Sequence, residues 1–170
     1  MQYTLLDLLN SGHILPGLEA ADARDAIQRL SDRLVETGHV TPGFAEDVWK
    51  REQTFPTGLP TEPLAVAIPH ADPDHVERSA VCVGVLKDPV SFGQMGTDGS
   101  TLLEVRLVFL LAIKEREKQV EMLGQLITLI QSPSLLEGLT TAAGPEEALK
   151  LIHATLGGKD GDADHPTDAA

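Results

Sequence analysis

The spacing of apolar residues predicts several helices along the chain. Over 20–36 and 120–130 an apolar residue recurs every three or four positions, which is the period of a helix with one buried face. In the second segment the predicted buried stripe consists of Val120, Leu123, Ile127 and Ile130. Thr41 followed by Pro42 predicts the N-cap and the first position of another helix. Helices are predicted over 20–36, 42–51, 120–130, 134–139 and 145–156.

Shorter apolar runs, rich in β-branched residues and bounded by turn residues, predict strands over 65–68, 79–86 and 103–113. The run 103–113 is apolar on both faces, which predicts a central strand that is covered on both sides. Asp88-Pro89 predicts a turn, with a short edge strand at 90–92 after it. The prolines and glycine of 55–63 argue against a helix or strand there.

The combination of these elements predicts an α+β or α/β fold. Three or four buried strands among amphipathic helices fit a three-layer sandwich, in which a mixed β-sheet is covered by helices on both faces. A length of 170 residues favours one domain, which we place at 1–158. The remaining segment, 159–170, is acidic and almost without large apolar residues, so we expect a disordered tail.

Composition and charge exclude several classes of function. The net charge of −13 argues against nucleic acid and anionic lipid as partners, because both need a basic surface. No apolar run approaches the roughly 20 residues that span a bilayer, and the N-terminus lacks the pattern of a signal peptide. A single cysteine, Cys82, excludes an internal disulfide and favours the cytoplasm. Because the net negative charge repels phosphate, any phosphate must be bound by local positive charge or backbone N–H groups.

The candidate chemistry lies in the segment 64–75. Pro69 ends the predicted strand 65–68, because proline cannot donate to a sheet ladder, and His70 follows at once. We expect the His70 imidazole to reach solvent from a backbone that the sheet holds rigid. A neutral imidazole is both a nucleophile and a metal ligand. Three further polar residues follow within five positions: Asp72, Asp74 and His75.

The residues alone leave three interpretations open. His70, Asp72, Asp74 and His75 offer nitrogen and oxygen ligands that suit zinc, manganese or iron, as in a metal-dependent hydrolase. Alternatively, His70 carries a phosphoryl group, which needs an orienting partner for its second ring nitrogen and donors for the phosphoryl oxygens, but no metal or cofactor. The third interpretation is a histidine in an ordinary surface turn.

The sequence resembles the enzyme IIA component of the sugar phosphotransferase system, within the fructose–mannitol superfamily. The resemblance covers about residues 18–156 and rests most on the apolar strand that ends in Ala67-Ile68-Pro69-His70. Two details lean to the galactitol-type branch: Phe55-Pro56-Thr57-Gly58, and His75-Val76 after the histidine. The other matching segments are Arg51-Glu52, Thr57-Gly58-Leu59, Val90-Ser91-Phe92, the strand before Ala112, and 119–126.

The resemblance implies a phosphotransferase component of the cytoplasm that needs no cofactor or metal. His70 would accept a phosphoryl group from the phosphocarrier HPr and pass it to a cognate IIB component, which works with a IIC membrane component in sugar or polyol uptake. Arg51 would support the phosphoryl group, with Thr57 and Gly58 in supporting positions. The sugar itself does not follow from the sequence.

Two points stay open after the resemblance. Mannitol-type members carry a second histidine at the position of Gln119, and glutamine forms hydrogen bonds but carries no charge. Either Gln119 orients the site, or His75 supplies the second imidazole. The resemblance also allows a regulatory protein, whose contacts with other proteins change when His70 is phosphorylated.

Overall fold

The computed structural model describes residues 3–164, with side chains up to Gly157. A five-stranded mixed sheet lies at its centre, in the order β1-β4-β5-β3-β2. β1 runs parallel to β4 and β3 parallel to β5, whereas the β4–β5 and β2–β3 pairs are antiparallel. The strands are β1 (Ile14–Leu18), β2 (Gly58–Leu59), β3 (Ala65–Ala67), β4 (Ala80–Gly93) and β5 (Leu102–Ala112).

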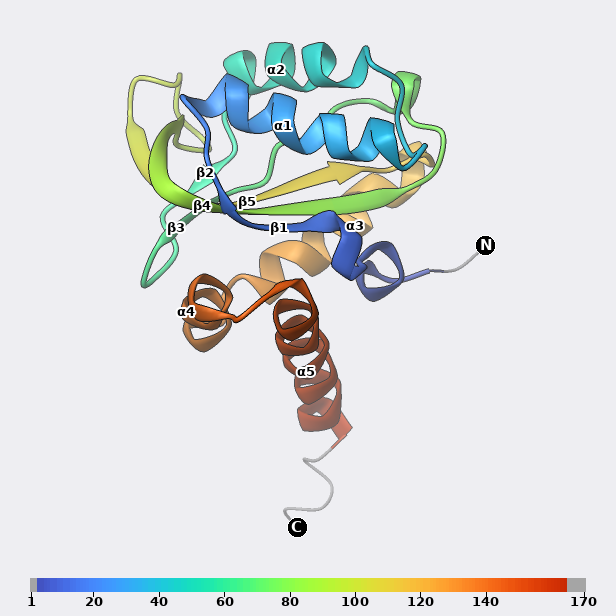
Figure 1. Cartoon of the computed structure of the whole chain (residues 1–170), viewed down its shortest axis with the longest axis vertical. Helices are drawn as coiled ribbons and strands as arrows, with labels where there is room; N and C mark the ends of the chain where they lie inside the picture. Colours follow the sequence, from blue (N-terminus) through green and yellow to red (C-terminus); the bar gives the residue numbers. More distant parts are fainter. Residues whose placement is uncertain (1–2, 165–170) are drawn as a thin grey trace.

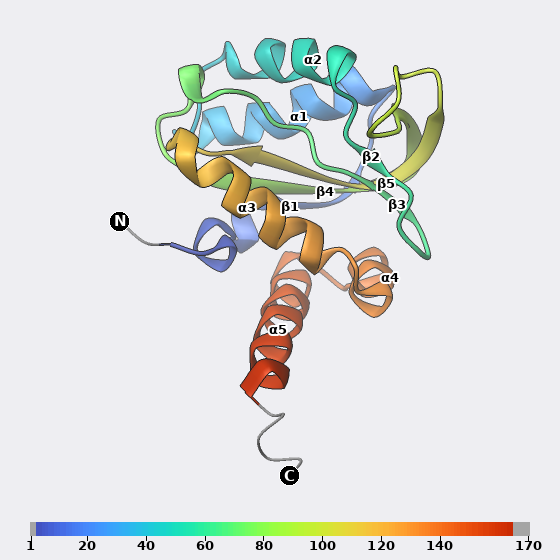
Figure 2. The ribbon, with the colours of Figure 1, turned by 180° about the vertical axis from the view of Figure 1, so that it is seen from behind.

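Helices cover both faces of this sheet, as Figures 1 and 2 show from opposite sides. One face carries α1 (Ala23–Glu36) and α2 (Phe44–Thr54). The other carries α3 (Arg116–Leu129), α4 (Pro133–Thr141) and α5 (Pro145–Asp164). Three short 3₁₀ helices are η1 (Leu5–Leu8), η2 (Ser11–His13) and η3 (Pro73–His75). The predicted three-layer sandwich is confirmed.

The alternating side chains of β5 build a hydrophobic core on each face of the sheet. Leu107, Phe109 and Leu111 pack toward α3, α4 and α5. Val108 and Leu110 pack toward α1 and α2. Full burial of such side chains stabilises a fold by about 1.5–3 kcal/mol each. β5 is therefore the central, doubly covered strand that the sequence predicted.

The sheet differs from the prediction at two places. The turn predicted at Asp88-Pro89 is wrong, and the strand predicted at 90–92 is not separate, because β4 continues through both and pairs with β5 to Gly93. The ladder shifts register between Val85 and Val90, so Pro89 lies in an exposed bulge that needs no ladder donor. The proline-rich stretch 55–63 does contain a strand, the short β2.

Three helices also differ from the prediction. α2 begins at Phe44 with Gly43 as its N-cap, and the Thr41 hydroxyl caps no helix, since it has no hydrogen-bond partner among the described residues. α3 begins at Arg116 and buries mainly the neighbouring stripe, so that Val120 is 79% exposed, whereas Ile130 of the predicted stripe is buried. The side chains that α3 buries are Met122, Leu126 and Leu129.

α5 extends past its predicted end at Leu156 to Asp164. The predicted tail, 159–170, overlaps the last positions of this helix, and positions 165–170 lie outside the described residues. The disorder of the tail therefore stays a prediction.

A buried histidine lies where η2 leads into β1. His13 is only 2% exposed, and its Nε2 lies 2.9 Å from the Thr37 hydroxyl, which also contacts His39 Nδ1 at 2.9 Å. Asn10 Nδ2 lies 3.1 Å from His13 Nδ1. Burial lowers the pKa of His13 to about 4, and the positive charges of His39 and two nearby arginines act in the same direction. The His13 ring is therefore neutral near pH 7.

We expect His13 to make the fold sensitive to mild acid. Below its ordinary pKa of 6.5 the unfolded chain binds a proton that the folded chain refuses until about pH 4. The free energy of unfolding should therefore fall over this interval, by up to about 3 kcal/mol from His13 alone. His13→Gln should lose this part of the pH dependence in urea unfolding. The exposed His153→Gln is the control, and a His13→Gln variant as acid-sensitive as wild type would contradict the assignment.

Candidate active site

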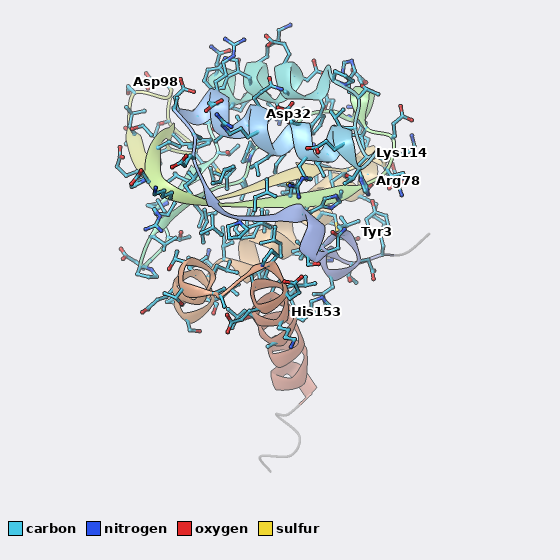
Figure 3. All side chains as sticks on the ribbon, viewed as in Figure 1. Tyr3, Asp32, Arg78, Asp98, Lys114 and His153 are labelled. Atoms are coloured by element: carbon cyan, nitrogen blue, oxygen red, sulfur yellow. The ribbon has the colours of Figure 1, made fainter. Side chains whose placement is uncertain are left out.

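His70 lies at the end of the sheet where β5 leads into α3. It forms a short parallel bridge with Leu111, and the Leu111 N–H donates to the Pro69 carbonyl at 3.0 Å. Arg78 and Lys114 mark the same end of the sheet in Figure 3, since one precedes β4 and the other follows β5. After β3 the chain runs along α2 to η3 (Figure 2). The central strand therefore fixes the backbone beside His70.

One hydrogen bond determines which nitrogen of the His70 ring is free. Nδ1 lies 2.9 Å from the carbonyl oxygen of Ile68. A carbonyl oxygen only accepts, so Nδ1 carries the hydrogen and Nε2 keeps its lone pair. Within the described residues the ring makes no second hydrogen bond. The residue is only 7% exposed, so the expectation of a ring that reaches well into solvent is wrong.

The surroundings of His70 keep its ring neutral. Burial lowers the pKa of His70 below the ordinary value of 6.5, because it disfavours the charged form. The contact with Ile68 and the charge of Asp72 raise this pKa, and the positive charge of Arg51 lowers it. The net direction is downward. At neutral pH the ring is therefore an unprotonated nucleophile.

Arg51 brings a positive charge to this site from the last turns of α2. Its guanidinium carbon lies 5.2 Å from the centre of the Phe55 ring, and its Nε is buried without a hydrogen-bond acceptor among the described residues. An unsatisfied buried donor costs about 1–3 kcal/mol, which an anion placed there would recover. Arg51 also lines a hollow of about 220 Å³ together with Asp47, Lys50, Ala71, Asp72 and Asp74.

Gln119 lies in the first turns of α3, and its Oε1 is likewise buried without a donor among the described residues. The start of α3 is joined to the His70 segment by an ion pair, since Arg116 Nη1 lies 3.2 Å from Asp72 Oδ1. This ion pair brings the helix that carries Gln119 against the segment that carries His70. The contact between Gln119 and the ring stays a prediction.

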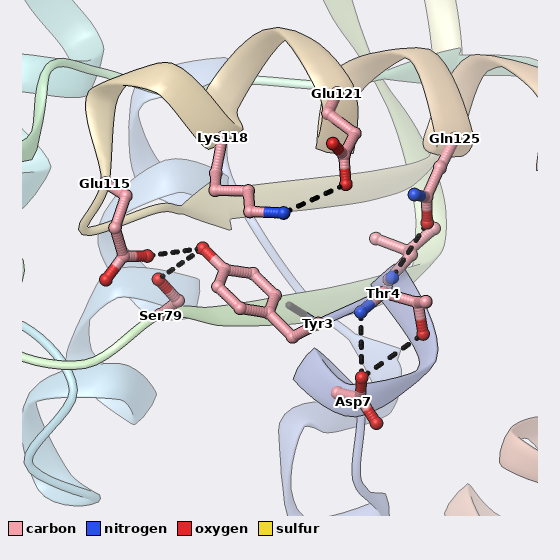
Figure 4. Close-up of polar contacts among 9 residues, drawn as sticks. Tyr3, Thr4, Asp7, Ser79, Glu115, Lys118, Glu121 and Gln125 are labelled. Atoms are coloured by element: carbon pink, nitrogen blue, oxygen red, sulfur yellow. Dashed lines mark hydrogen bonds and ion pairs between the residues drawn. The ribbon is translucent and has the colours of Figure 1, made fainter. Parts of the chain in front are cut away.

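The N-terminal segment of the chain holds the start of α3 in place (Figure 4). The Tyr3 hydroxyl donates to Glu115 Oε1 at 2.5 Å and lies 3.4 Å from Ser79 Oγ, just before β4. Further along, the Leu5 N–H donates to Gln125 Oε1 at 2.9 Å. The N-terminal segment thus contacts α3 at two places, at Glu115 beside Ser79 and at Gln125 in the second half of the helix.

The His75 side chain contacts α2 and the residue that precedes it. Its Nδ1 lies 2.6 Å from Asp47 Oδ2, and its Nε2 packs so closely on Gly43 that a Cβ there would lie 2.5 Å away. Nδ1 is thereby committed to Asp47, and the ring packs on the residue that precedes α2. This arrangement argues against His75 as the second imidazole of the site.

The metal interpretation has no ligand set in the structure. The described part of the chain contains no group of three or more His, Cys, Asp or Glu side chains arranged to hold a metal ion. Asp72 pairs with Arg116, and His75 pairs with Asp47. The residues close in sequence therefore do not converge on one point.

A buried carboxylate that sequence reasoning missed lies beneath the site. Glu52 is 6% exposed, and it accepts hydrogen bonds from the Thr57 N–H and hydroxyl, both at 2.8 Å. Burial raises the pKa of Glu52 to about 7, and the two hydrogen bonds from Thr57 oppose that rise. Its helical spacing from the buried Phe44 and Val48 is the signal that could have found it.

Thr57 and Gly58, the two predicted supporting residues, both contact the backbone of neighbouring segments. The Thr57 hydroxyl accepts the Ile68 N–H at 3.2 Å, which ties Thr57 to the strand before His70. A Cβ at Gly58 would lie 2.6 Å from the Gly93 carbonyl oxygen, so glycine lets β2 approach the end of β4.

Comparisons with known proteins show the family and the fold that this chain shares. Residues 7–155 match the family model "Phosphoenolpyruvate-dependent sugar phosphotransferase system, EIIA 2". The galactitol-specific EIIA component of Escherichia coli K12 is 29% identical over 134 residues, which cover 79% of this chain and 87% of that protein. The transcriptional regulator ManR of Bacillus subtilis is 28% identical over 124 residues, 72% of this chain but 17% of the regulator.

A solved complex of the mannitol enzyme IIA with phosphorylated enzyme IIB from Escherichia coli contains a similar fold. The TM-score is 0.72 at 26% identity, and the match covers 86% of this chain and 97% of that one.

We expect Gly43→Ala to destabilise the protein by about 1–3 kcal/mol, because the new methyl group overlaps the His75 ring. Gly124→Ala is the matched control. No atom lies within 4 Å of the added Cβ there, so replacing a helical glycine should stabilise by about 0.5–1 kcal/mol. Thermal unfolding measures both changes. An unchanged melting temperature for Gly43→Ala would mean that His75 is not held against α2.

Proposed function

The chain belongs to the EIIA 2 family of the phosphoenolpyruvate-dependent sugar phosphotransferase system, and on that premise we propose that His70 is its phosphorylated residue. His70 accepts a phosphoryl group from HPr and passes it to a cognate IIB component during sugar or polyol uptake. The observation that carries the proposal is the hydrogen bond from Nδ1 to Ile68, which leaves the lone pair on Nε2 of a neutral ring.

The transfer needs no cofactor. The Nε2 lone pair attacks the phosphorus of phosphorylated HPr, a new N–P bond forms, and the bond from phosphorus to the donor breaks. The ring gains positive charge as the bond forms, and the hydrogen bond from Nδ1 to Ile68 strengthens with that charge. Transfer to IIB follows the same steps in reverse on a new acceptor.

Local groups must offset the negative field of the whole protein. With a net charge of −13, the chain repels a dianionic phosphoryl group at long range. The Arg51 guanidinium, whose buried Nε has no acceptor among the residues that the structure describes, provides charge and donors for the phosphoryl oxygens. Gln119 offers an amide from the start of α3 as a neutral counterpart of the second histidine of mannitol-type proteins.

The partners follow from the family. The solved IIA–IIB complex of the mannitol system supports a IIB component as the acceptor, and we propose HPr as the donor and a IIC component in the membrane. The galactitol-specific relative favours a polyol system. None of the described helices has the length and apolar character needed to cross a membrane. We place the protein in the cytoplasm, where its phosphoryl donor would be.

A second candidate function is regulatory. The match to part of ManR supports it, because ManR is a transcriptional regulator that contains a stretch similar to this chain. Transfer to a IIB component separates the two functions, since a carrier gives up its phosphoryl group to IIB and a regulator retains it.

We expect one acid-labile phosphate on the wild type after incubation with enzyme I, HPr and phosphoenolpyruvate, and none on His70→Ala. Intact-mass analysis before and after acid treatment makes the measurement. His75→Ala is the control, because the His75 ring is committed to α2 and should not affect the label. Equal labelling of His70→Ala and wild type would refute the site.

Removal of Arg51 should slow the transfer from HPr by about 100-fold in rapid-quench experiments, because the phosphoryl oxygens lose their cationic donor. The transfer rate of Arg51→Lys should lie between those of wild type and Arg51→Ala, since an ammonium lacks the planar fork of the guanidinium. Gln119→Ala should transfer the phosphoryl group about tenfold more slowly. Gln119→His should keep most of the wild-type rate, because imidazole also donates a hydrogen bond.

Arg24→Ala is the control for these variants, since it removes the same charge from an exposed position on α1. Equal rates for Arg51→Ala and Arg24→Ala would show that Arg51 acts only through the overall field.

A further inference from the structure

We propose that Glu52 and Thr57 are positioning residues for His70: they hold Ile68, whose carbonyl decides which nitrogen of the ring is free. The inference rests on the proposed role of His70 as phosphoryl acceptor. Neither residue needs to touch the phosphoryl group for this role.

A continuous chain of buried hydrogen bonds connects the carboxylate to the ring. Glu52 Oε2 accepts the Thr57 N–H and Glu52 Oε1 accepts the Thr57 hydroxyl, each at 2.8 Å. The Thr57 hydroxyl oxygen accepts the Ile68 N–H at 3.2 Å. The Ile68 carbonyl accepts from His70 Nδ1 at 2.9 Å. Glu52, Thr57 and Ile68 are 6%, 3% and 1% exposed, so water does not substitute for these partners.

The Thr57 hydroxyl takes the place of a sheet partner for Ile68. The β2–β3 ladder pairs Leu59 with Val66 and Gly58 with Ala67, and no further residue of that edge pairs with Ile68. Thr57 precedes β2, so its side chain continues the ladder by one position. Pro69 has no N–H to extend it further. Ile68 is thus the last residue whose backbone is fixed from this edge before His70.

The direction of each hydrogen bond is determined. The Ile68 N–H only donates, so the Thr57 oxygen accepts from it and gives its single hydrogen to Glu52. The Glu52 oxygens both accept from Thr57, which the ionised carboxylate does without conflict. Protonation of Glu52 Oε1 would turn the Thr57 hydroxyl hydrogen away from its only acceptor. The carboxylate therefore orients the hydroxyl that holds Ile68.

Burying the ionised carboxylate of Glu52 costs free energy, which supports a role for this residue beyond packing. Burial raises the pKa of Glu52 to about 7 even though two hydrogen bonds from Thr57 lower it, so the carboxyl is fully ionised only above neutral pH. An apolar residue would fit the buried face of α2, alongside Phe44 and Val48, at lower cost. What the carboxylate adds is the orientation of Thr57.

Loss of this orientation should be visible at the His70 ring itself. If Ile68 is no longer held, its carbonyl loses its alignment with Nδ1, and the ring samples both neutral tautomers. In the second tautomer Nε2 carries the hydrogen and cannot attack phosphorus. A purely structural role for Glu52 and Thr57 would lower stability without changing the tautomer.

The test compares four variants by nitrogen NMR of the His70 ring and by the rate of phosphoryl transfer from HPr. Thr57→Val removes the hydroxyl, and Thr57→Ser restores it. Glu52→Gln keeps the shape, but one orientation of its amide faces the Thr57 N–H and the other leaves the Thr57 hydroxyl without an acceptor. Thr61→Val is the matched control, because the Thr61 hydroxyl donates to the Leu64 carbonyl at 2.7 Å in the same segment.

Wild type, Thr57→Ser and Thr61→Val should show hydrogen on Nδ1 and similar rates. Thr57→Val and Glu52→Gln should show mixed tautomers and about tenfold slower transfer, the effect of one mispaired buried hydrogen bond. Folded Thr57→Val with the wild-type tautomer and rate would overturn the proposal, even if its melting temperature falls. If Glu52→Gln does not fold, the Thr57→Val and Thr57→Ser pair gives the same decision.

Failure of the proposed function has a different signature. A wild type that takes no phosphate from HPr would refute the carrier, whereas the tautomers of the variants would still test the positioning of the ring.

Discussion

The hydrogen bond from His70 Nδ1 to the Ile68 carbonyl is the interaction on which the rest of the site depends. It turns a histidine into an oriented nucleophile, because it leaves one lone pair free on one ring nitrogen. The bond is possible because β5 holds the chain on either side of Pro69, through the Leu111 N–H and the short bridge to His70. The sheet therefore fixes the position of the Ile68 carbonyl oxygen.

Charge is organised on two scales in this protein. The whole chain is strongly acidic, and at long range it does not attract phosphate. At the site, burial and the positive charge of Arg51 both lower the pKa of His70, so the ring stays neutral although a cation is near. Adjacent residues of α2 have different surroundings, since Arg51 lines the hollow with Asp72 and Asp74, whereas Glu52 turns inward to Thr57. One helical turn thus carries both the cation whose charge acts on the His70 ring and the carboxylate that binds Thr57.

The sequence allowed the local features to be predicted and left the non-local ones open. Strand 65–68 and the place of His70 follow from a short apolar run and a proline, which act within a few residues. The bulge in β4 was missed because Asp88-Pro89 has the local signature of a turn, and only pairing with β5 carries the strand through it. The buried face of α3 was misplaced because two adjacent stripes are apolar, and the sheet decides which one is covered.

Polar partners were harder still to predict. An acidic residue on a helix is usually exposed, so the sequence did not predict that Glu52 is buried and bonded to Thr57. His75 and Asp72 lie close to His70 in sequence, but Asp47 and Arg116 draw them to other elements.

The most direct test of the account is the position of phosphorus on the ring. Protein labelled with nitrogen isotope and phosphorylated through enzyme I and HPr would be observed by NMR, with detection of coupling between phosphorus and the ring nitrogens. The account predicts coupling to Nε2 of His70, with the hydrogen retained on Nδ1. Phosphorus on Nδ1 of His70, or on any other residue, would contradict it.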